Sequence, residues 1–185
     1  PVPLTNSLLL SCCCLKKIHW DNRFEDDTGN DCLVSVDGTD FQIPQLMPFS
    51  KIWFSHKFKG PGLRYEVCLC IHTGYIVWIH GPFECGSWPD IEIFRNSLMS
   101  HSGPSERVEA DDGYVGESPR YVKCPLSFTA EEDKAKMQLR VRGRQESVNK
   151  RFKQWACLKD LFRHSVSKHN AVFNAVAVIT QLSIE

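Results

Sequence analysis

The stretch Arg64-Tyr-Glu-Val-Cys-Leu-Cys-Ile-His-Thr-Gly-Tyr-Ile-Val-Trp-Ile-His80 contains two runs rich in β-branched and aromatic residues, which favour strands. Only Thr73-Gly74 separates the two runs, and glycine tolerates the positive φ that a tight turn requires. The stretch therefore predicts a β-hairpin. Cys68 and Cys70 fall on one face of its first strand, where we expect buried free thiols.

Further strand-like segments lie on both sides of this hairpin. Cys32-Leu-Val-Ser-Val-Asp37 is a short β-branched run, and we expect it to end at its carboxylate, before Gly38. The segment from Arg107 to Asp111 has the same character and also ends on acidic residues followed by glycine. Residues 121–125 could form one more strand of this kind.

Three other segments have the periodicity of helices. Apolar residues recur at steps of three and four between positions 91 and 98, with Ser87 as the expected cap and Pro89 in the first turn. A second helical pattern runs over residues 129–158, and a third over residues 160–181. Strands and helices in this order predict one mixed α/β domain.

Charge is balanced overall but unevenly distributed. The 185 residues include 22 Lys and Arg and 22 Asp and Glu, and with 42% hydrophobic and 24% charged residues the chain is not disordered throughout. Residues 134–168 contain 11 basic and two acidic residues, which leaves 11 basic and 20 acidic residues elsewhere. Such a basic segment indicates either a phosphate-binding surface or a solvated helix that balances an acidic body.

Cysteine spacing and hydropathy exclude two classes of protein. The nine cysteines contain no Cys-x-x-Cys pair, so no zinc module is predicted, and free thiols are typical of a reducing compartment. Apolar stretches are too short or too interrupted to cross a bilayer, and we expect no membrane association. We interpret residues 1–30 as a poorly patterned N-terminal remnant and residues 31–185 as the folded domain.

Two predicted strands end on carboxylates, as a metal-dependent phosphoryl-transfer site requires. Mg²⁺ prefers hard oxygen ligands and keeps several waters, so two or three carboxylates suffice to hold it. Neighbouring strands would bring Asp37 and Asp111 together, and Glu146, an acid within the basic segment, would be the third. Simpler interpretations exist, because Asp-Gly sequences are common in turns and Glu146 could pair with Arg142 or Lys150 along its helix.

Four blocks of the sequence together resemble one family. The blocks are Val36-Asp-Gly-Thr-Asp40, Gly86-Ser-Trp-Pro-Asp90 with Phe94-Arg95, Ala110-Asp-Asp-Gly-Tyr114 and Arg144-Gln-Glu-Ser-Val-Asn-Lys-Arg-Phe-Lys153. In this order, over about residues 21–185, they resemble the DDE superfamily endonucleases of Harbinger-type transposons. The resemblance implies a ribonuclease-H-like α/β fold, a mixed sheet flanked by helices. It implies Asp37 on the first strand, Asp111 on the fourth and Glu146 on a following helix as the catalytic, metal-binding residues, with Mg²⁺, or Mn²⁺ as its substitute, as cofactor.

Some positions depart from the family pattern or leave an assignment open. The family often has His where this chain has Asp40. Its catalytic Glu often stands directly before an Arg-x-Phe-like stretch, nearer to Asn149, and we choose Glu146 because Asn is a neutral and weaker ligand. Asp112 adjoins Asp111, but only one of two consecutive strand residues can face the metals, and the family pattern selects Asp111.

Asp90 matches an acidic residue that the family has after the hairpin, and helix capping is an equal alternative for it. The histidines His56, His72, His80, His164 and His169 have no metal-ligand spacing, and we assign them no chemistry.

The sequence therefore predicts a metal-dependent DNA endonuclease, a transposase-like phosphoryl transferase that cuts DNA phosphodiesters by a two-metal mechanism. Phosphate contacts are expected from the basic segment, at Arg140, Arg144, Lys150 and Arg151. The alternative is a catalytically inactive, domesticated or decayed transposase domain that acts as a DNA-binding or protein-interaction module. The resemblance also implies nuclear localisation and DNA as partner, and it leaves a separate DNA-binding partner protein and an oligomer open as alternatives.

Overall fold

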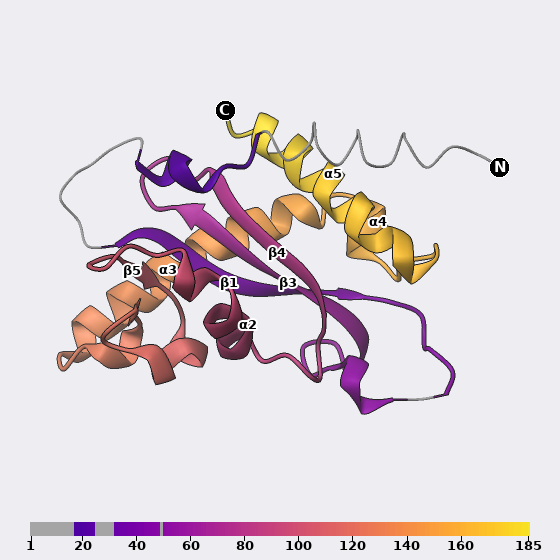
Figure 1. Ribbon diagram of the computed structural model, residues 1–185, viewed down its shortest axis with the longest axis horizontal. Helices are drawn as coiled ribbons and strands as arrows, with labels where there is room; N and C mark the ends of the chain where they lie inside the picture. The colour runs from indigo at the N-terminus through magenta and orange to yellow at the C-terminus, as the bar shows by residue number, and fades with distance from the viewer. Residues whose placement is uncertain (1–16, 25–31, 49) are drawn as a thin grey trace.

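A computed structural model of the 185-residue chain describes residues 17–24, 32–48 and 50–185 (Figure 1). The strands are β1 (Cys32–Gln42), β2 (Phe54–Ser55), β3 (Gly60–Cys70), β4 (Ile76–Glu84), β5 (Arg107–Glu109) and β6 (Val122–Lys123). The α-helices are α2 (Asp90–Asn96), α3 (Glu131–Phe152), α4 (Ala156–Lys159) and α5 (His169–Leu182). Short 3-10 helices are η1 (Trp20–Phe24), η2 (Lys51–Trp53), η3 (Leu98–Ser100), η4 (Asp112–Glu117), η5 (Pro125–Ser127) and η6 (Val166–Lys168).

The strands form one mixed sheet. β1 pairs antiparallel with β3 and parallel with β5, while β3 pairs antiparallel with β4 and β5 pairs parallel with β6. The main sheet therefore has the order β4-β3-β1-β5-β6, and the short β2 pairs with the start of β3. This mixed sheet flanked by helices confirms the predicted α/β, ribonuclease-H-like fold class.

The predicted hairpin is present as β3 and β4. The amide of Cys70 donates to the carbonyl of Tyr75 at 2.8 Å, and Gly74 takes the expected positive φ of 73° in the turn. Cys68 and Cys70 are buried free thiols in one hydrophobic cluster, as predicted.

The prediction that the first strand ends at Asp37 is wrong. β1 continues to Gln42 because the backbone from Val34 to Gln42 pairs continuously with β3. Gly38 lies opposite Glu66 in this ladder, so the sequence Asp37-Gly38 forms part of a strand. Long-range pairing has overridden the local preference of Asp-Gly for a turn.

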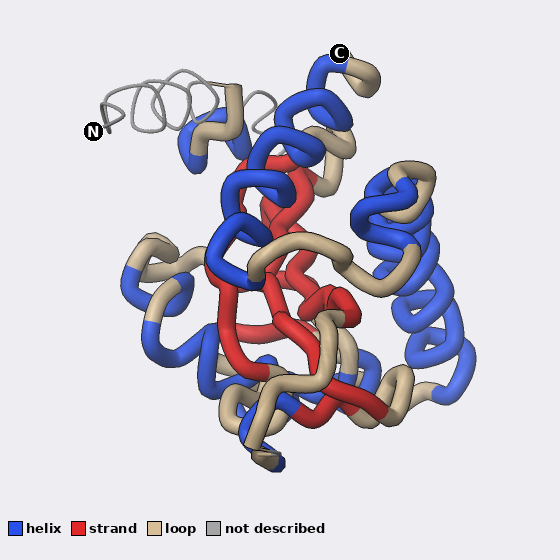
Figure 2. The backbone as a smooth tube through the Cα atoms, turned by 90° about the vertical axis from the view of Figure 1, so that its right-hand side faces the viewer, coloured by secondary structure: helices blue, strands red, loops and turns tan. Residues whose placement is uncertain are grey.

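Helices cover both faces of the sheet (Figure 2). One hydrophobic cluster joins β1, β3 and β4 to α3, α4 and α5, with Phe152, Leu158 and Phe173 buried in it. A second cluster joins the sheet to α2, η3 and η4, through Phe94 and Tyr114 among others. The sheet therefore forms the middle of three layers.

Helix boundaries differ from the prediction at several points. α2 begins at Asp90, with Pro89 at the cap position and no side-chain cap bond, so Ser87 is not its cap. The second predicted helix is divided by residues 153–155 into α3 and α4. Residues 160–168 do not join the last α-helix, because the amide of Phe162 donates to the carbonyl of Gln42 and holds this segment along the end of β1. Within the described residues, no helix is both long and apolar enough to span a membrane.

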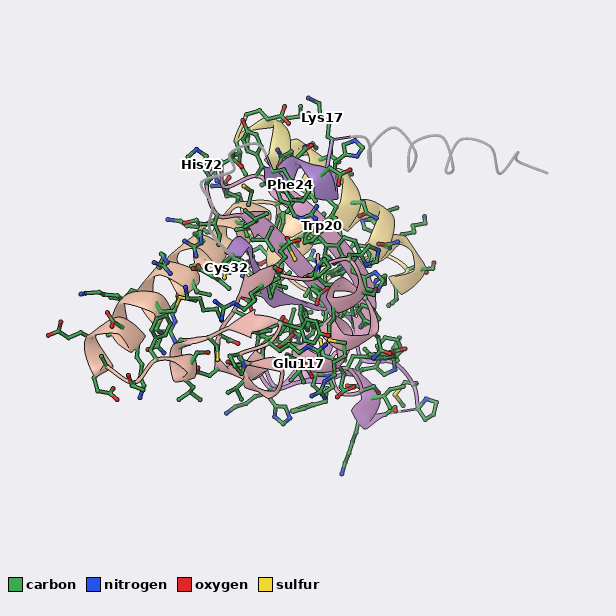
Figure 3. All side chains as sticks on the ribbon, turned by 60° about the vertical axis from the view of Figure 1, so that its left-hand side comes forward. Lys17, Trp20, Phe24, Cys32, His72 and Glu117 are labelled. Atoms are coloured by element: carbon green, nitrogen blue, oxygen red, sulfur yellow. The ribbon has the colours of Figure 1, made fainter. Side chains whose placement is uncertain are left out.

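Part of the segment interpreted as an N-terminal remnant packs against the domain. The Trp20 ring lies 5.9 Å from that of Trp78 in an edge-on arrangement, and the buried Arg23 donates to Glu106 at 2.8 Å. Lys17 lies beside the C-terminal helix, 2.9 Å from Glu185 (Figure 3). The rest of that segment lies outside the described residues.

Candidate active site

The parallel part of the sheet ends just before the two aspartates predicted from the sequence. β1 and β5 pair in parallel as far as Ser35 and Glu109. Asp37 follows this point on β1, and Asp111 follows it after β5. Because the carboxyl ends of parallel strands meet at one edge of a sheet, both aspartates emerge at the same edge. Asp111 follows the fifth strand and not the fourth, because the two-residue β2 precedes the hairpin.

An open cavity of about 450 Å³ lies at this edge, between β1, the segment after β5 and α3. All three predicted catalytic acids, Asp37, Asp111 and Glu146, line it. Two cationic side chains, Lys57 and Arg142, line the same cavity. Residues far apart in the sequence thus form one site that contains both carboxylates and cations.

Asp37 is the acid with the most perturbed environment. The pKa of Asp37 is raised from 3.8 to about 7, chiefly by burial; the negative charges of Asp90 and Asp111 add to this rise, and the positive charge of Lys57 opposes it. The Lys57 ammonium donates to the carbonyl of Gly38 at 2.6 Å, which places it beside Asp37. A bound cation would favour the ionised form of this carboxylate.

Asp111 and Asp112 make different local contacts, although both line the cavity. The exposed Asp111 caps η4, and one of its oxygens accepts from the amide of Gly113 at 2.9 Å. Asp112 accepts from the amide of Leu126 at 3.0 Å and so joins η4 to η5. In both residues the bond is to Oδ1.

Glu146 and Asn149 both reach the cavity from α3, to different depths. The Glu146 side chain is 72% exposed. It lies 4.0 Å from Arg142, one of the two residues with which the sequence suggested it could pair along the helix. Asn149 is half-buried in the same lining. The buried Gln145, directly before Glu146 on α3, donates to the carbonyl of Ser35 at 3.0 Å and fixes α3 against β1.

The donor set fits a hard divalent cation at two of the three predicted acids. Asp37 and Asp111 offer carboxylate oxygens at one edge, and the charges of Asp90 and Asp111 add to burial in raising the pKa of Asp37. In the part of the chain that the structure describes, no group of three or more His, Cys, Asp or Glu side chains is close enough to hold a metal ion. The exposed Glu146 therefore shares the cavity with the two aspartates without forming a compact three-acid cluster with them.

Comparison with known proteins identifies the family. The sequence profile described as DDE superfamily endonuclease matches residues 36–181. The chain belongs to this family. No curated protein and no solved structure matches the chain. DDE endonucleases generally use divalent metal ions, which agrees with the carboxylates of the cavity.

Asp40, which replaces the histidine common in DDE endonucleases of the predicted type, organises a buried polar cluster. Arg64 donates to its two oxygens at 2.7 and 3.0 Å, and the Ser55 hydroxyl donates at 2.5 Å. Burial alone would raise the pKa of Asp40, but the hydrogen bonds from Arg64 and Ser55 and the charge of Lys57 hold it below its ordinary value. Asp40 therefore stays ionised and holds β2 and β3 against β1.

Asp90 lies against the strand that carries Asp37. A Cβ on Gly38 would stand only 1.7 Å from Asp90 Oδ1, so this close approach requires glycine. That oxygen is buried, 3.3 Å from Arg64 Nε, and has no hydrogen-bond partner among the residues that the structure describes. Burial raises the pKa of Asp90 above its ordinary value, against the lowering charge of Arg64. The structure thus places Asp90 beneath the site, and the helix-cap alternative fails because Pro89 occupies the cap position.

The arginines predicted to contact DNA do not line the cavity. Arg140 and Arg144 both form ion pairs with the buried Glu109. Together with Arg151 they line a separate hollow on the other side of α3. Lys150 is exposed and lines neither the cavity nor this hollow. These four residues therefore project from α3 away from the cavity that Asp37, Asp111 and Glu146 line.

The cations that do line the cavity, Lys57 and Arg142, were not among the residues predicted from the sequence. Arg142 was considered there only as a partner of Glu146. Its position four residues before Glu146 is the signal that could have placed it on the same side of α3. The sequence signal for Lys57 is weaker: it lies in a segment, residues 41–65, that contains no acidic residue to pair with it.

Proposed function

We propose that this protein is a metal-dependent DNA endonuclease with transposase-like phosphoryl transferase activity. The observation that carries this proposal is that Asp37, Asp111 and Glu146 line one cavity together with Lys57 and Arg142. Carboxylates suit a divalent cation, and the two cations suit the phosphate of a nucleic acid backbone. Family membership supports a nuclease reaction.

Asp37 and Asp111 would hold Mg²⁺ or Mn²⁺, with Glu146 or Asn149 as the third side chain. When bound, a pair of such ions activates the attacking oxygen and stabilises the leaving oxygen of an in-line displacement. The nucleophile is water in a cutting step and a DNA 3′-hydroxyl in a joining step.

The protein's own cations have a distinct task in this reaction. Lys57 is held beside Asp37 by its bond to the Gly38 carbonyl, and Arg142 projects from α3 into the same cavity. Both can bind non-bridging phosphate oxygens and orient the scissile phosphate over the carboxylates. Phosphate contacts carry no sequence information, so we assign target recognition to a separate DNA-binding protein or segment.

Membership of the Harbinger-type subgroup and action in the nucleus are parts of this proposal. The four sequence blocks in their family order support the subgroup. A nuclear location follows from the proposed substrate, since a transposase-like enzyme acts on chromosomal DNA.

The test is nicking of supercoiled plasmid DNA with Mg²⁺ or Mn²⁺ and with EDTA. We expect Asp37→Asn and Asp111→Asn to reduce nicking by at least about 100-fold, because charge stabilisation by a bound ion contributes several kcal/mol to such a reaction. Asp21→Asn, at a 92% exposed position on η1, is the matched control and should leave nicking unchanged. Unchanged nicking in both site variants would contradict the proposal.

A further pair of variants identifies the third side chain. If Glu146 takes part, Glu146→Gln loses nicking and Asn149→Ala retains most of it. The reverse result would assign the role to Asn149, which is more deeply placed in the cavity.

One observation favours a second candidate function, a non-catalytic DNA-binding module. The exposed Glu146 does not form a compact cluster with Asp37 and Asp111 among the described residues. DNA binding without nicking in any divalent metal would support this candidate over the endonuclease.

A further inference from the structure

A second basic region lies outside α3, in the connection between β1 and β3. Residues 50–59, called the lysine loop below, contain Lys51, Lys57 and Lys59, and no acidic residue occurs anywhere in residues 41–65. All three lysines are exposed. The loop includes η2 and β2 and lies at the lower right of Figure 1.

The charges of the lysine loop are not neutralised by close acidic partners. No carboxylate among the described residues lies within 4.0 Å of the three ammonium groups, whereas Arg140 and Arg144 both pair with Glu109. The side chain of Lys57 enters the cavity that contains Asp37. The loop therefore extends positive charge outward from the wall of the proposed active site.

The backbone of the lysine loop is held in place at several points. The Ser50 hydroxyl accepts from the amide of Ile52, and the carbonyl of Ile52 accepts from the amide of Gly86 at 2.8 Å. The Ser55 hydroxyl donates to the buried Asp40 and accepts from the amide of Lys57 at 3.2 Å. Such a loop presents its lysines in a preformed arrangement, which lowers the ordering cost of binding.

Lys59 has an unusual backbone conformation. Its φ is +53°, in the left-handed region that residues with a side chain rarely adopt and that glycine occupies freely. This turn exposes the Lys59 side chain at the surface of the loop.

We propose that the lysine loop is a DNA contact surface that grips the phosphate backbone next to the scissile phosphate. This inference rests on the proposed function, since it takes DNA as the substrate of the cavity. Lys57 binds at the cavity wall, and Lys51 and Lys59 bind phosphates of the strand that continues beyond it. The sequence predicts phosphate contacts at Arg140, Arg144, Lys150 and Arg151 of α3, whereas this proposal assigns them to the lysine loop and to Arg142, which projects from α3 into the cavity.

The test measures DNA binding as a function of salt concentration, with a short duplex in EDTA so that no cutting occurs. Each phosphate contact contributes about −0.9 to the slope of log K against log salt, so Lys51→Ala/Lys59→Ala should make the slope shallower by about 1.8. Lys51→Arg/Lys59→Arg should keep the wild-type slope, because it keeps both charges. The matched control is Lys17→Ala/Lys136→Ala, which removes two exposed lysines that have acidic neighbours and do not line the cavity. Its slope should equal that of the wild type.

Failure of this inference differs from failure of the proposed function. If the Ala loop variant and the control have the same slope, or if the wild type has a slope near zero, the loop is not a DNA contact. Loss of nicking in Asp37→Asn tests the endonuclease independently of that result. One combined result would overturn the endonuclease and keep the loop as a DNA contact. In that result the plasmid is never nicked, and the salt slope of DNA binding becomes shallower in the Ala loop variant but not in the control.

Discussion

Two charged clusters lie at the same end of the sheet and are compensated to different degrees. Around Glu109, one buried carboxylate pairs with two arginines, Arg140 and Arg144. Around Asp37, burial raises the pKa values of Asp37 and Glu66 to about 7 and also that of Asp90.

The cations of the second cluster do not offset its carboxylates. Arg64 is engaged by Asp40 through two hydrogen bonds, and Lys57, beside Asp37, lines the cavity together with Arg142 from α3. The difference indicates that the Glu109 cluster is closed, and it leads us to expect that an added cation stabilises the Asp37 cluster.

Removal of the charge of Glu109 should have the largest effect on stability. Glu109→Gln leaves Arg144, whose side chain is only 18% exposed, without its counter-charge, and breaking a buried pair in this way costs about 3–5 kcal/mol. Urea denaturation measures the loss of unfolding free energy. Glu92→Gln, which breaks an exposed pair with Arg95, should change it far less. Equal effects of the two variants would mean that the Glu109 cluster is not closed.

The pH dependence of stability should reveal the uncompensated cluster. Glu66 has a pKa of about 7 in the fold and 4.5 ordinarily, with burial as the main cause. Between these pH values the folded state binds more protons than the unfolded state, so the stability contributed by protonated Glu66 is present below pH 4.5 and lost as pH rises through 7. Glu66→Gln should remove this loss, which amounts to about 3 kcal/mol between pH 4.5 and pH 8.

Denaturation at several pH values gives the slope of unfolding free energy against pH. A loss of stability that the substitution causes equally at every pH does not change this slope. Asp37, whose pKa is raised from 3.8 to about 7, contributes in the same direction in both proteins, so Glu66→Gln should keep part of the loss while the wild type, with both groups, loses stability more steeply. Identical pH slopes for the two proteins would show that Glu66 is ionised in the fold.

Much of the fold could be predicted from the sequence, because its signals are local. The hairpin follows from two β-rich runs around Thr73-Gly74, and the helices follow from apolar spacing. The extension of β1 beyond Asp37 could not be predicted, because it depends on pairing with β3 and not on the local sequence Asp-Gly. The separation of residues 160–168 from α5 likewise depends on a tertiary hydrogen bond, from the amide of Phe162 to the carbonyl of Gln42.

The three acids that line the cavity could be predicted from the sequence, whereas the two cations that line it could not. Asp37, Asp111 and Glu146 belong to recognisable sequence blocks, and the structure places them along one cavity. A count of basic residues pointed to α3 as a whole, but it does not show which cations already have partners. Arg140 and Arg144 are bound to Glu109, and that pairing exists only in the folded chain.

Addition of a divalent ion should stabilise the Asp37 cluster. An ion that binds only the folded chain, at a free concentration of ten times its Kd, adds about 1.4 kcal/mol to the free energy of unfolding. The unfolded chain has no preformed site for it. Thermal melts with millimolar Mg²⁺ or Mn²⁺ should therefore show a higher Tm than melts in EDTA. Asp111→Asn should abolish this shift, while Asp21→Asn should retain it. A shift that survives in Asp111→Asn would place the ion elsewhere on the protein.

The smallest expected effect is on the salt dependence of DNA binding, and it should differ between a cation that lines the cavity and a cation of the Glu109 cluster. Arg142 lines the cavity, whereas Arg140, on the same helix, is paired with Glu109 at 2.7 Å. Arg142→Ala should make the salt slope of DNA binding shallower by about 0.9, which is a loss of one phosphate contact. Arg140→Ala removes the same charge and should leave the slope unchanged, because its partner carboxylate already neutralises it. A shallower slope in Arg140→Ala, with none in Arg142→Ala, would place the DNA on the other side of α3, as the sequence had predicted, and would separate it from the carboxylates of the cavity.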